Sequence, residues 1–201
     1  LQNENSEAKF ITDEILEGIK NGKKYSDYAI LYRMNAQSNS VERAFTAAGI
    51  PYKVYGGMRF YDRKEIKDII AYLSVINNPY DMLRLKRIIN EPKRGIGDTA
   101  LDKLDMLASE SGISIFELIQ NSNNLVGIRS AGNIILFRDM MNDLIKLKDT
   151  MKVSELIKKV LKDSGYEDML NSEGTKETEI RFDNLMEFIG VAMEFENENA
   201  E

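Results

Sequence analysis

The sequence contains no cysteine, no histidine and no tryptophan, and it has only 3 prolines in 201 residues. Without cysteine there are no disulfides and no thiolate chemistry. Without histidine, the commonest metal ligand and the usual general base near neutral pH are missing. These absences exclude many classes of enzyme site. The lack of cysteine also fits a reducing compartment, so we expect a cytoplasmic protein.

Long apolar runs are lacking as well. No stretch approaches the roughly 20 apolar residues of a membrane-spanning helix, so we expect a soluble protein with no membrane partner. The first residues, Leu1 to Asn5, include neither an initiator methionine nor the basic and apolar regions of a signal peptide. This beginning predicts a fragment or a processed chain.

Acidic residues outnumber basic ones, and the formal net charge is -6. Negative charge disfavours nucleic-acid binding, because duplex affinity depends largely on neutralising phosphates. The charge is uneven, however. The segment from Arg59 to Arg94 has 9 basic and 5 acidic side chains, whereas the remainder has 18 and 28. Such asymmetry indicates one face that meets an anion; the alternative is that these cations coat solvated helix faces.

The first 62 residues predict an α/β segment. Apolar residues recur at helical spacing from Phe10 to Ile19, and a second predicted helix from Val41 to Ala48 ends at Gly49. The runs Tyr28 to Tyr32 and Tyr52 to Tyr55 predict two short parallel strands. Helix, strand, helix, strand is the order of an α/β fold.

From Lys64 onward the sequence shows only helical periodicity, which predicts a larger all-α domain over residues 63–201. The predicted helices are Ile66 to Ile76, Leu83 to Ile89, Thr99 to Ala108, Ile115 to Ile119, Ile134 to Leu147, Val153 to Leu161 and Ile180 to Phe195. No internal repeat is evident. The acidic tail from Glu194 to Glu201 is expected to be frayed or to be a cut end. The predicted fold class is therefore α/β plus all-α.

Two polar residues that follow the first predicted strand are candidates for binding phosphate. Arg33 and Asn35 lie where ligands usually bind in open α/β sheets. The arginine can form two hydrogen bonds to a phosphate, and the asparagine can donate an amide proton. The alternative is that Arg33 pairs with solvent or a carboxylate while Ser38 or Asn39 caps the next helix.

A glycine turn between two predicted helices is the more suggestive segment. It consists of Lys93, Arg94, Gly95, Ile96, Gly97, Asp98 and Thr99. Glycine permits positive φ and lets a phosphate come close, and amides at the start of the next helix point toward such an anion. With the basic pair, the turn would bind a DNA backbone without reading bases. The alternative is a glycine C-cap followed by Asp98 or Thr99 as an N-cap.

Other chemistry is not evident. No Gly-x-x-x-x-Gly-Lys-Ser/Thr sequence occurs, so the phosphate loop that binds ATP is missing. No carboxylate pair and no nucleophile with a base stand out, so we predict no catalytic, metal or cofactor site in this chain. Tyr32, Tyr55, Phe60 and Tyr61 could stack on bases, although aromatic rings at such spacings also fill cores.

Three blocks, in order, closely resemble the UvrD/PcrA/Rep family of superfamily 1A DNA helicases. They are Tyr28 to Ser38, Ile50 to Asp68 and Lys93 to Asp98, with a weaker likeness at Arg181 to Phe188. The resemblance implies two RecA-like motor domains, 1A and 2A, each with an inserted helical domain, 1B and 2B. Residues 1–62 would then be a partial RecA-like domain 2A, and residues 63–201 much of domain 2B.

The resemblance also implies roles for particular residues. In the family, the residues matching Arg33 and Asn35 contact the single strand, and the hairpin matching Gly95 to Gly97 contacts the duplex ahead of the fork. Ala100 stands where some relatives have a hydroxyl residue, so a side-chain phosphate contact is not expected there.

The whole parent protein would be a helicase of 3′ to 5′ polarity, dependent on ATP and Mg²⁺, that acts in DNA repair or replication. This fragment alone would bind DNA and hydrolyse nothing. One alternative is a protein-interaction or autoinhibitory module that contacts repair or transcription proteins. Another is an independent enzyme with a carboxylate site.

Overall fold

The computed structural model describes residues 4–32, 38–55 and 59–199. The chain divides into two compact units, Leu1–Arg63 and Lys64–Glu201. This division falls one residue from the predicted domain boundary. Each unit is described by itself.

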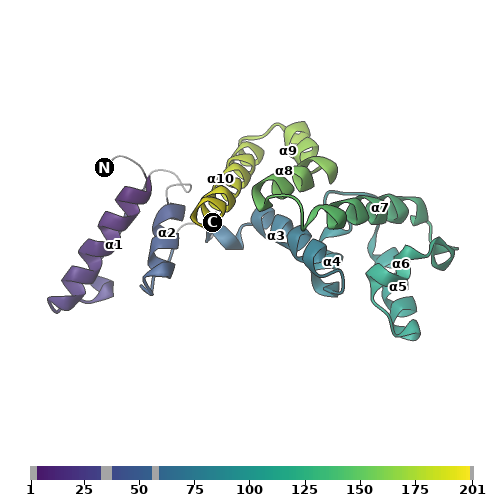
Figure 1. Cartoon of the computed structure of the whole chain (residues 1–201), viewed down its shortest axis with the longest axis horizontal. Coiled ribbons are helices and arrows are strands. Elements are labelled where there is room, and N and C mark those ends of the chain that lie inside the picture. The colour runs from purple at the N-terminus through teal and green to yellow at the C-terminus, as the bar shows by residue number, and fades with distance from the viewer. Residues whose placement is uncertain (1–3, 33–37, 56–58, 200–201) are drawn as a thin grey trace. The chain divides into compact units, whose positions relative to one another are not determined.

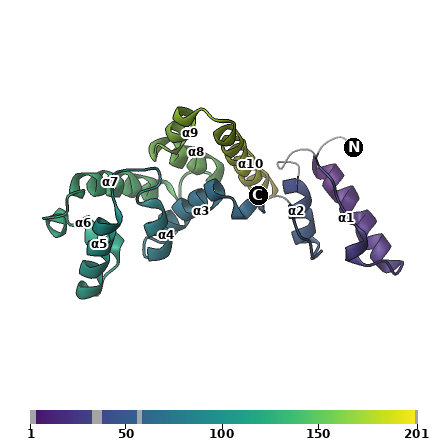
Figure 2. The ribbon, with the colours of Figure 1, turned by 180° about the vertical axis from the view of Figure 1, so that it is seen from behind.

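Unit 1 is built around two α-helices. Its described elements are α1 (Glu4–Lys20), η1 (Tyr25–Asp27), α2 (Ser38–Ala47) and η3 (Phe60–Asp62). α1 and α2 lie side by side in both views (Figures 1 and 2). Their apolar faces enclose a small core of Ile15, Phe45 and Ile50. The rings of Phe45 and Tyr52 add an edge-to-face contact with centroids 5.9 Å apart.

The two predicted strands are not formed, so the prediction of a RecA-like α/β segment with parallel strands is wrong. Within the described residues, neither Tyr28 to Tyr32 nor Tyr52 to Tyr55 makes a β-bridge. Ile30 and Tyr52 do pack against the core of unit 1, whereas Leu31 is 95% exposed. The apolar pattern thus predicted packing side chains, but a strand also needs a neighbouring strand whose backbone bonds to it.

Unit 2 is helical throughout its described part. Its elements are α3 (Lys64–Asn77), α4 (Met82–Ile88), α5 (Asp98–Ser111), α6 (Ile115–Gln120), η4 (Ser122–Leu125), α7 (Ala131–Leu147), α8 (Val153–Asp163), α9 (Tyr166–Glu173) and α10 (Lys176–Glu198). The sequence pattern located all of these α-helices except α9. Because α10 continues through Glu198, the predicted fraying from Glu194 is wrong up to that residue.

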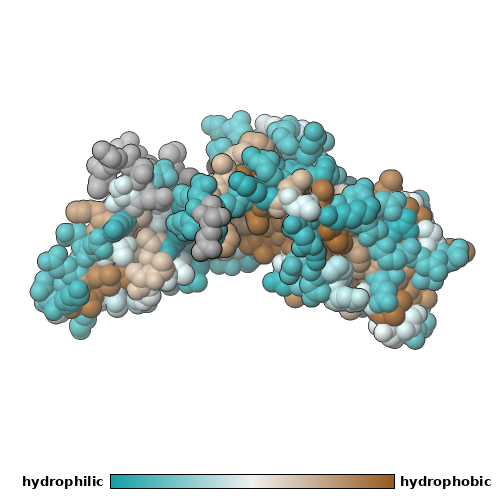
Figure 3. Space-filling view, viewed as in Figure 1, coloured by the Kyte–Doolittle hydropathy of each residue, from teal (hydrophilic) through white to brown (hydrophobic). Residues whose placement is uncertain are grey.

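Helix α3 is the centre of unit 2 and contacts α4, α7, α8 and α10. Ile66, Ile69, Tyr72 and Ile76 recur along α3 at helical spacing and are almost completely buried. Burying one such side chain contributes roughly 1.5–3 kcal/mol. In Figure 3, hydrophobic residues of unit 2 show between the hydrophilic patches. The amphipathic pattern of α3 therefore determines how the other helices pack around it.

Helices α5 and α6 form a hairpin at one end of unit 2 (Figure 1). Gly112, with φ of 65°, ends α5 in the left-handed conformation. Ser114 then caps α6, because its Oγ accepts a hydrogen bond from the amide of Glu117 at 3.1 Å. The glycine turn predicted to bind phosphate lies where the chain passes from α4 to α5. Among the described residues, no helix is long and apolar enough to cross a membrane.

Candidate nucleic-acid interface

The glycine turn between α4 and α5 lies at the surface of unit 2 and has one buried anchor. Lys93, Gly95 and Gly97 are exposed, whereas Ile96 is completely buried. Gly95 has φ of 70°, a conformation that costs a residue with a side chain free energy. The buried isoleucine thus fixes the turn to the core while the glycines on either side of it face outward.

Asn90 shapes the backbone of this turn. Its Oδ1 accepts hydrogen bonds from the amides of Arg94 at 2.8 Å and Ile96 at 3.1 Å. Those two amides are therefore occupied and do not face an anion. Sequence reasoning missed Asn90, because an asparagine near the end of a helix has many ordinary roles in turns.

The amides at the start of α5 are open. Gly97 is the N-cap of α5 and provides no side chain to cap it, so neither Asp98 nor Thr99 is the N-cap. Within the described part of unit 2, the amides of Gly97, Asp98 and Thr99 have no protein acceptor. Unpaired amides at the positive end of a helix dipole are the groups that bind phosphate.

The side chain of Arg94 points into the protein. Its Nη1 donates to the carbonyl oxygens of Ile88 at 3.1 Å, Ile89 at 3.4 Å and Pro92 at 3.1 Å. Two of these carbonyls belong to the C-terminal end of α4, where partial negative charge accumulates. The guanidinium is thus held by the fold and is not available to a phosphate in this conformation.

The second terminal nitrogen of Arg94 ties the turn to more distant helices. Nη2 donates to the hydroxyl of Tyr72 at 2.8 Å and to the carbonyl of Ser164, at the end of α8, at 2.9 Å. The guanidinium also lies 5.4 Å from the centroid of the Phe137 ring. Burial raises the pKa of the Tyr72 hydroxyl to about 12, so this hydroxyl stays protonated at neutral pH. Arg94 therefore positions the turn.

Four of the nine cations between Arg59 and Arg94 that were predicted to face an anion form ion pairs within unit 2. The pairs are Lys64 with Glu91 (2.6 Å), Arg84 with Asp81 (2.7 Å), Lys86 with Asp105 (2.8 Å) and Arg87 with Asp68 (2.7 Å). The alternative was that these cations coat solvated helix faces; the structure instead shows them in ion pairs with carboxylates of unit 2. Lys93 differs, because it is exposed and makes no ion pair among the described residues.

Asp68 joins three helices in the interior of unit 2. The residue is 1% exposed, and its Oδ1 accepts from Nε of Arg87 at 2.7 Å. Its Oδ2 accepts from the hydroxyl of Tyr166 at 2.8 Å. Burial, together with the charge of Asp68, raises the pKa of Tyr166 far above its usual range. The buried carboxylate is satisfied by protein donors, so it is a structural group.

All of residues 1–201 match the family described as UvrD-like helicase C-terminal domain. The chain belongs to this family. It is 43% identical over 195 residues to an ATP-dependent DNA helicase PcrA of Staphylococcus epidermidis and 40% identical over 195 residues to one of Staphylococcus aureus. Each match covers 96% of this chain and 27% of the relative, so the chain spans about a quarter of these relatives. The predicted family is confirmed.

The part of this UvrD-like domain predicted to contact single-stranded DNA is only partly visible. Arg33 and Asn35 lie outside the described residues. Tyr32 and Ser38, on either side of them, border a groove of about 750 Å³ in unit 1. Of the candidate stacking rings, Tyr55 is 79% exposed and Phe60 only 1% exposed. The structure therefore leaves Tyr55 open to solvent and places Phe60 in the interior.

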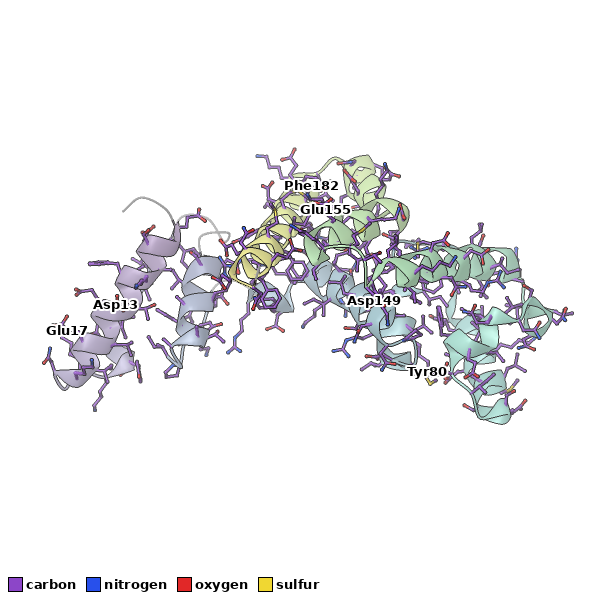
Figure 4. All side chains as sticks on the ribbon, in the orientation of Figure 1. Asp13, Glu17, Tyr80, Asp149, Glu155 and Phe182 are labelled. Atoms are coloured by element: carbon purple, nitrogen blue, oxygen red, sulfur yellow. The ribbon has the colours of Figure 1, made fainter. Side chains whose placement is uncertain are left out.

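Acidic groups in the described part of this UvrD-like domain do not gather into a metal site. Among the described residues, no group of three or more histidine, cysteine, aspartate and glutamate side chains could hold a metal ion. In Figure 4, Asp149 lies in the connection between α7 and α8, while Glu155 lies on α8. Glu155 is paired with Lys158 at 2.8 Å. The candidate interface of unit 2 is thus the glycine turn with its amides and Lys93.

Proposed function

We propose that this chain is part of an ATP-dependent DNA helicase, and that unit 2 holds DNA through Lys93 and the turn from Gly95 to Thr99. The observation that carries this proposal is the row of unpaired amides at the exposed start of α5. Relatives named ATP-dependent DNA helicase support DNA as the ligand. In the whole protein, ATP and Mg²⁺ would drive unwinding, and Arg33 and Asn35 would contact a single strand.

The proposed contact uses backbone amides and one ammonium group. Such donors bind phosphate oxygens and do not touch base edges, so the binding is independent of sequence. Because each neutralised phosphate releases counterions, affinity falls as salt rises, with a slope of about 0.9 per contact in a double-logarithmic plot. Arg94 and Asn90 take part only indirectly, by holding the backbone of the turn in place.

Gly97→Asp offers a test in which stability and binding change in opposite directions. Gly97 has ordinary angles, with φ of -83° and ψ of 172°, and a Cβ there would meet no atom within 4 Å. An aspartate at this N-cap would accept hydrogen bonds from the open amides and so stabilise α5 by a few tenths of a kcal/mol. The same carboxylate would repel a phosphate. We expect an unchanged or raised unfolding midpoint together with loss of duplex binding.

Binding is measured by fluorescence anisotropy with a labelled duplex that carries a 3′ single-stranded tail, over a series of salt concentrations. Lys148→Ala serves as the matched control, because it also lowers the net charge by one and Lys148 is exposed at the C-terminal end of helix α7. It should leave affinity nearly unchanged. The proposal fails if the chain does not bind the duplex at low salt, or if Gly97→Asp binds as tightly as the original chain.

A further inference from the structure

The turn that leads into α7 has the same backbone pattern as the turn that leads into α5. Each has a glycine in the left-handed region, with φ of 70° at Gly95 and 77° at Gly127. Each glycine precedes a buried isoleucine, Ile96 at 0% exposure and Ile128 at 6%. In each case a long helix begins within three residues of that isoleucine. The sequence pattern did not indicate this repeat, because the second turn lacks the second glycine.

The two turns are neighbours in unit 2. A Cβ added to Gly95 would lie 3.3 Å from Nδ2 of Asn133, in the first turn of α7. From the other side, Nζ of Lys103 on α5 donates to the carbonyl of Gly127 at 3.1 Å. The start of α7 is therefore adjacent to the proposed phosphate-binding turn.

The start of α7 contains donors that the fold does not use. Ser130 is the N-cap of α7 and makes no capping hydrogen bond. It is 8% exposed, and its Oγ has no hydrogen-bond partner in the described structure. A buried polar group without a partner costs free energy unless a ligand satisfies it. Next to it, Arg129 is exposed and forms no ion pair among the described residues.

A ligand can approach these donors without a steric clash. Gly132 is the second residue of α7 and is exposed, and a Cβ placed there would meet nothing within 4 Å. The amides at the start of α7 carry the positive end of a helix of 17 residues. The amide of Ala131 donates to the carbonyl of Ile128 at 3.1 Å, which leaves the amide of Gly132, the guanidinium of Arg129 and the hydroxyl of Ser130 as donors for a phosphate.

We propose that residues 127–132 bind a second phosphate of the same DNA molecule, with Arg129, the hydroxyl of Ser130 and the amide of Gly132 as donors. This inference rests on the proposed function of the first turn. The hydroxyl of Ser130 is covered in the free protein, so it reaches the phosphate after rotation about χ1. Two adjacent contacts would fix the direction of the DNA axis, whereas one contact leaves the duplex free to pivot.

The test compares single and double substitutions in the full 201-residue chain. Affinity for a labelled blunt duplex is measured by anisotropy across a salt series for Lys93→Ala, Arg129→Ala, the double variant and the control Lys148→Ala. Each of the first two should reduce the salt slope by about 1, the double variant by about 2, and the control not at all.

The outcomes separate the two proposals. If Lys93→Ala lowers the slope while Arg129→Ala does not, the second phosphate contact is overturned and the first stands. If Arg129→Ala alone lowers it, the first turn loses its role and the second contact stands. If neither changes the slope, both proposals are overturned.

Ser130→Ala distinguishes a serine that binds DNA from one that only stabilises the fold. Because the buried hydroxyl has no protein partner, its removal should leave the thermal unfolding midpoint unchanged or raise it, while lowering duplex affinity about three- to tenfold. A variant that unfolds at lower temperature and binds DNA as before would show that the hydroxyl serves the fold, and would remove Ser130 from the proposed site.

Discussion

At the residue scale, Arg94 shows how acceptors determine what a cation does. Its guanidinium donates to carbonyl oxygens at the ends of α4 and α8 and to the hydroxyl of Tyr72. The sequence placed Arg94 beside Lys93 and a glycine turn, so both cations were predicted to contact DNA. Only Lys93 is exposed to solvent. The acceptor at Ser164 lies 70 positions away in the chain, so no local pattern could reveal it.

We predict that Arg94→Ala lowers the free energy of unfolding by about 2–3 kcal/mol, because it leaves several buried carbonyl oxygens without a donor. Arg94→Lys should recover only part of this loss, since an ammonium group cannot span acceptors on two helices. Urea denaturation followed by circular dichroism measures both values. Lys93→Ala, one residue away and exposed, should change stability by less than about 0.5 kcal/mol. Equal effects at the two positions would contradict the assignment.

At the scale of elements, helical periodicity was a reliable guide in unit 2 because its helices have continuous apolar faces. The short helix α9 (Tyr166–Glu173) escaped prediction, since eight residues between Gly165 and Gly174 offer too few repeats of the pattern. The strands predicted over Tyr28 to Tyr32 and Tyr52 to Tyr55 failed for another reason. Tyr28 to Tyr32 was predicted as a buried strand, yet Leu31 is 95% exposed, and backbone pairing depends on neighbouring segments.

The C-terminal part of α10 was expected to fray, yet it caps another helix. Glu196 accepts hydrogen bonds from the amide of Ser154 at 2.7 Å and from its hydroxyl at 2.8 Å, at the start of α8. The amide hydrogen bond is the main reason that the pKa of Glu196 is lowered from its usual 4.5. A charged cap at a helix start also complements the helix dipole.

We predict that Glu196→Gln lowers the unfolding midpoint at neutral pH, and that its difference from the original chain disappears in acid. A carboxyl with a lowered pKa in the folded state contributes stability above its unfolded pKa of about 4.5 and loses that contribution as pH falls through the folded pKa. Thermal unfolding of both proteins between pH 7 and pH 3 measures this. A difference that stays constant over that range would contradict the role of the charged carboxylate.

At the scale of the whole molecule, the sequence predicted the family and the first glycine turn, but not the second turn. The family was identified from three ordered blocks, because those motifs keep their order whatever the local structure. The amides at the start of α5 could be predicted from the glycine turn itself. The second turn, with Arg129 and Ser130, could not, because it shares only a Gly-Ile pair with the first in sequence, and the likeness of backbone angles and burial appears only in the structure.

Unit 2 contains its own core and its own polar contacts, so we predict that residues 64–201 fold without unit 1. Asn184 donates to Glu65 at 2.6 Å and Tyr166 to Asp68 at 2.8 Å, which joins α3 to α10 and α9. The isolated unit should unfold cooperatively by circular dichroism and keep the duplex affinity of the full chain. A broad, non-cooperative transition would show that the unit depends on the rest of the protein.

The anchoring of Arg94 has a consequence for how this domain could transmit movement. One planar guanidinium bonds both to the last turn of α4 and to Ser164, the C-cap of α8, and the backbone of Arg94 is part of the glycine turn. A tilt of α8 would therefore pull directly on the loop proposed to grip the duplex. A movement near Ser164, which is distant from the turn in the sequence, would therefore change the affinity of the turn for DNA.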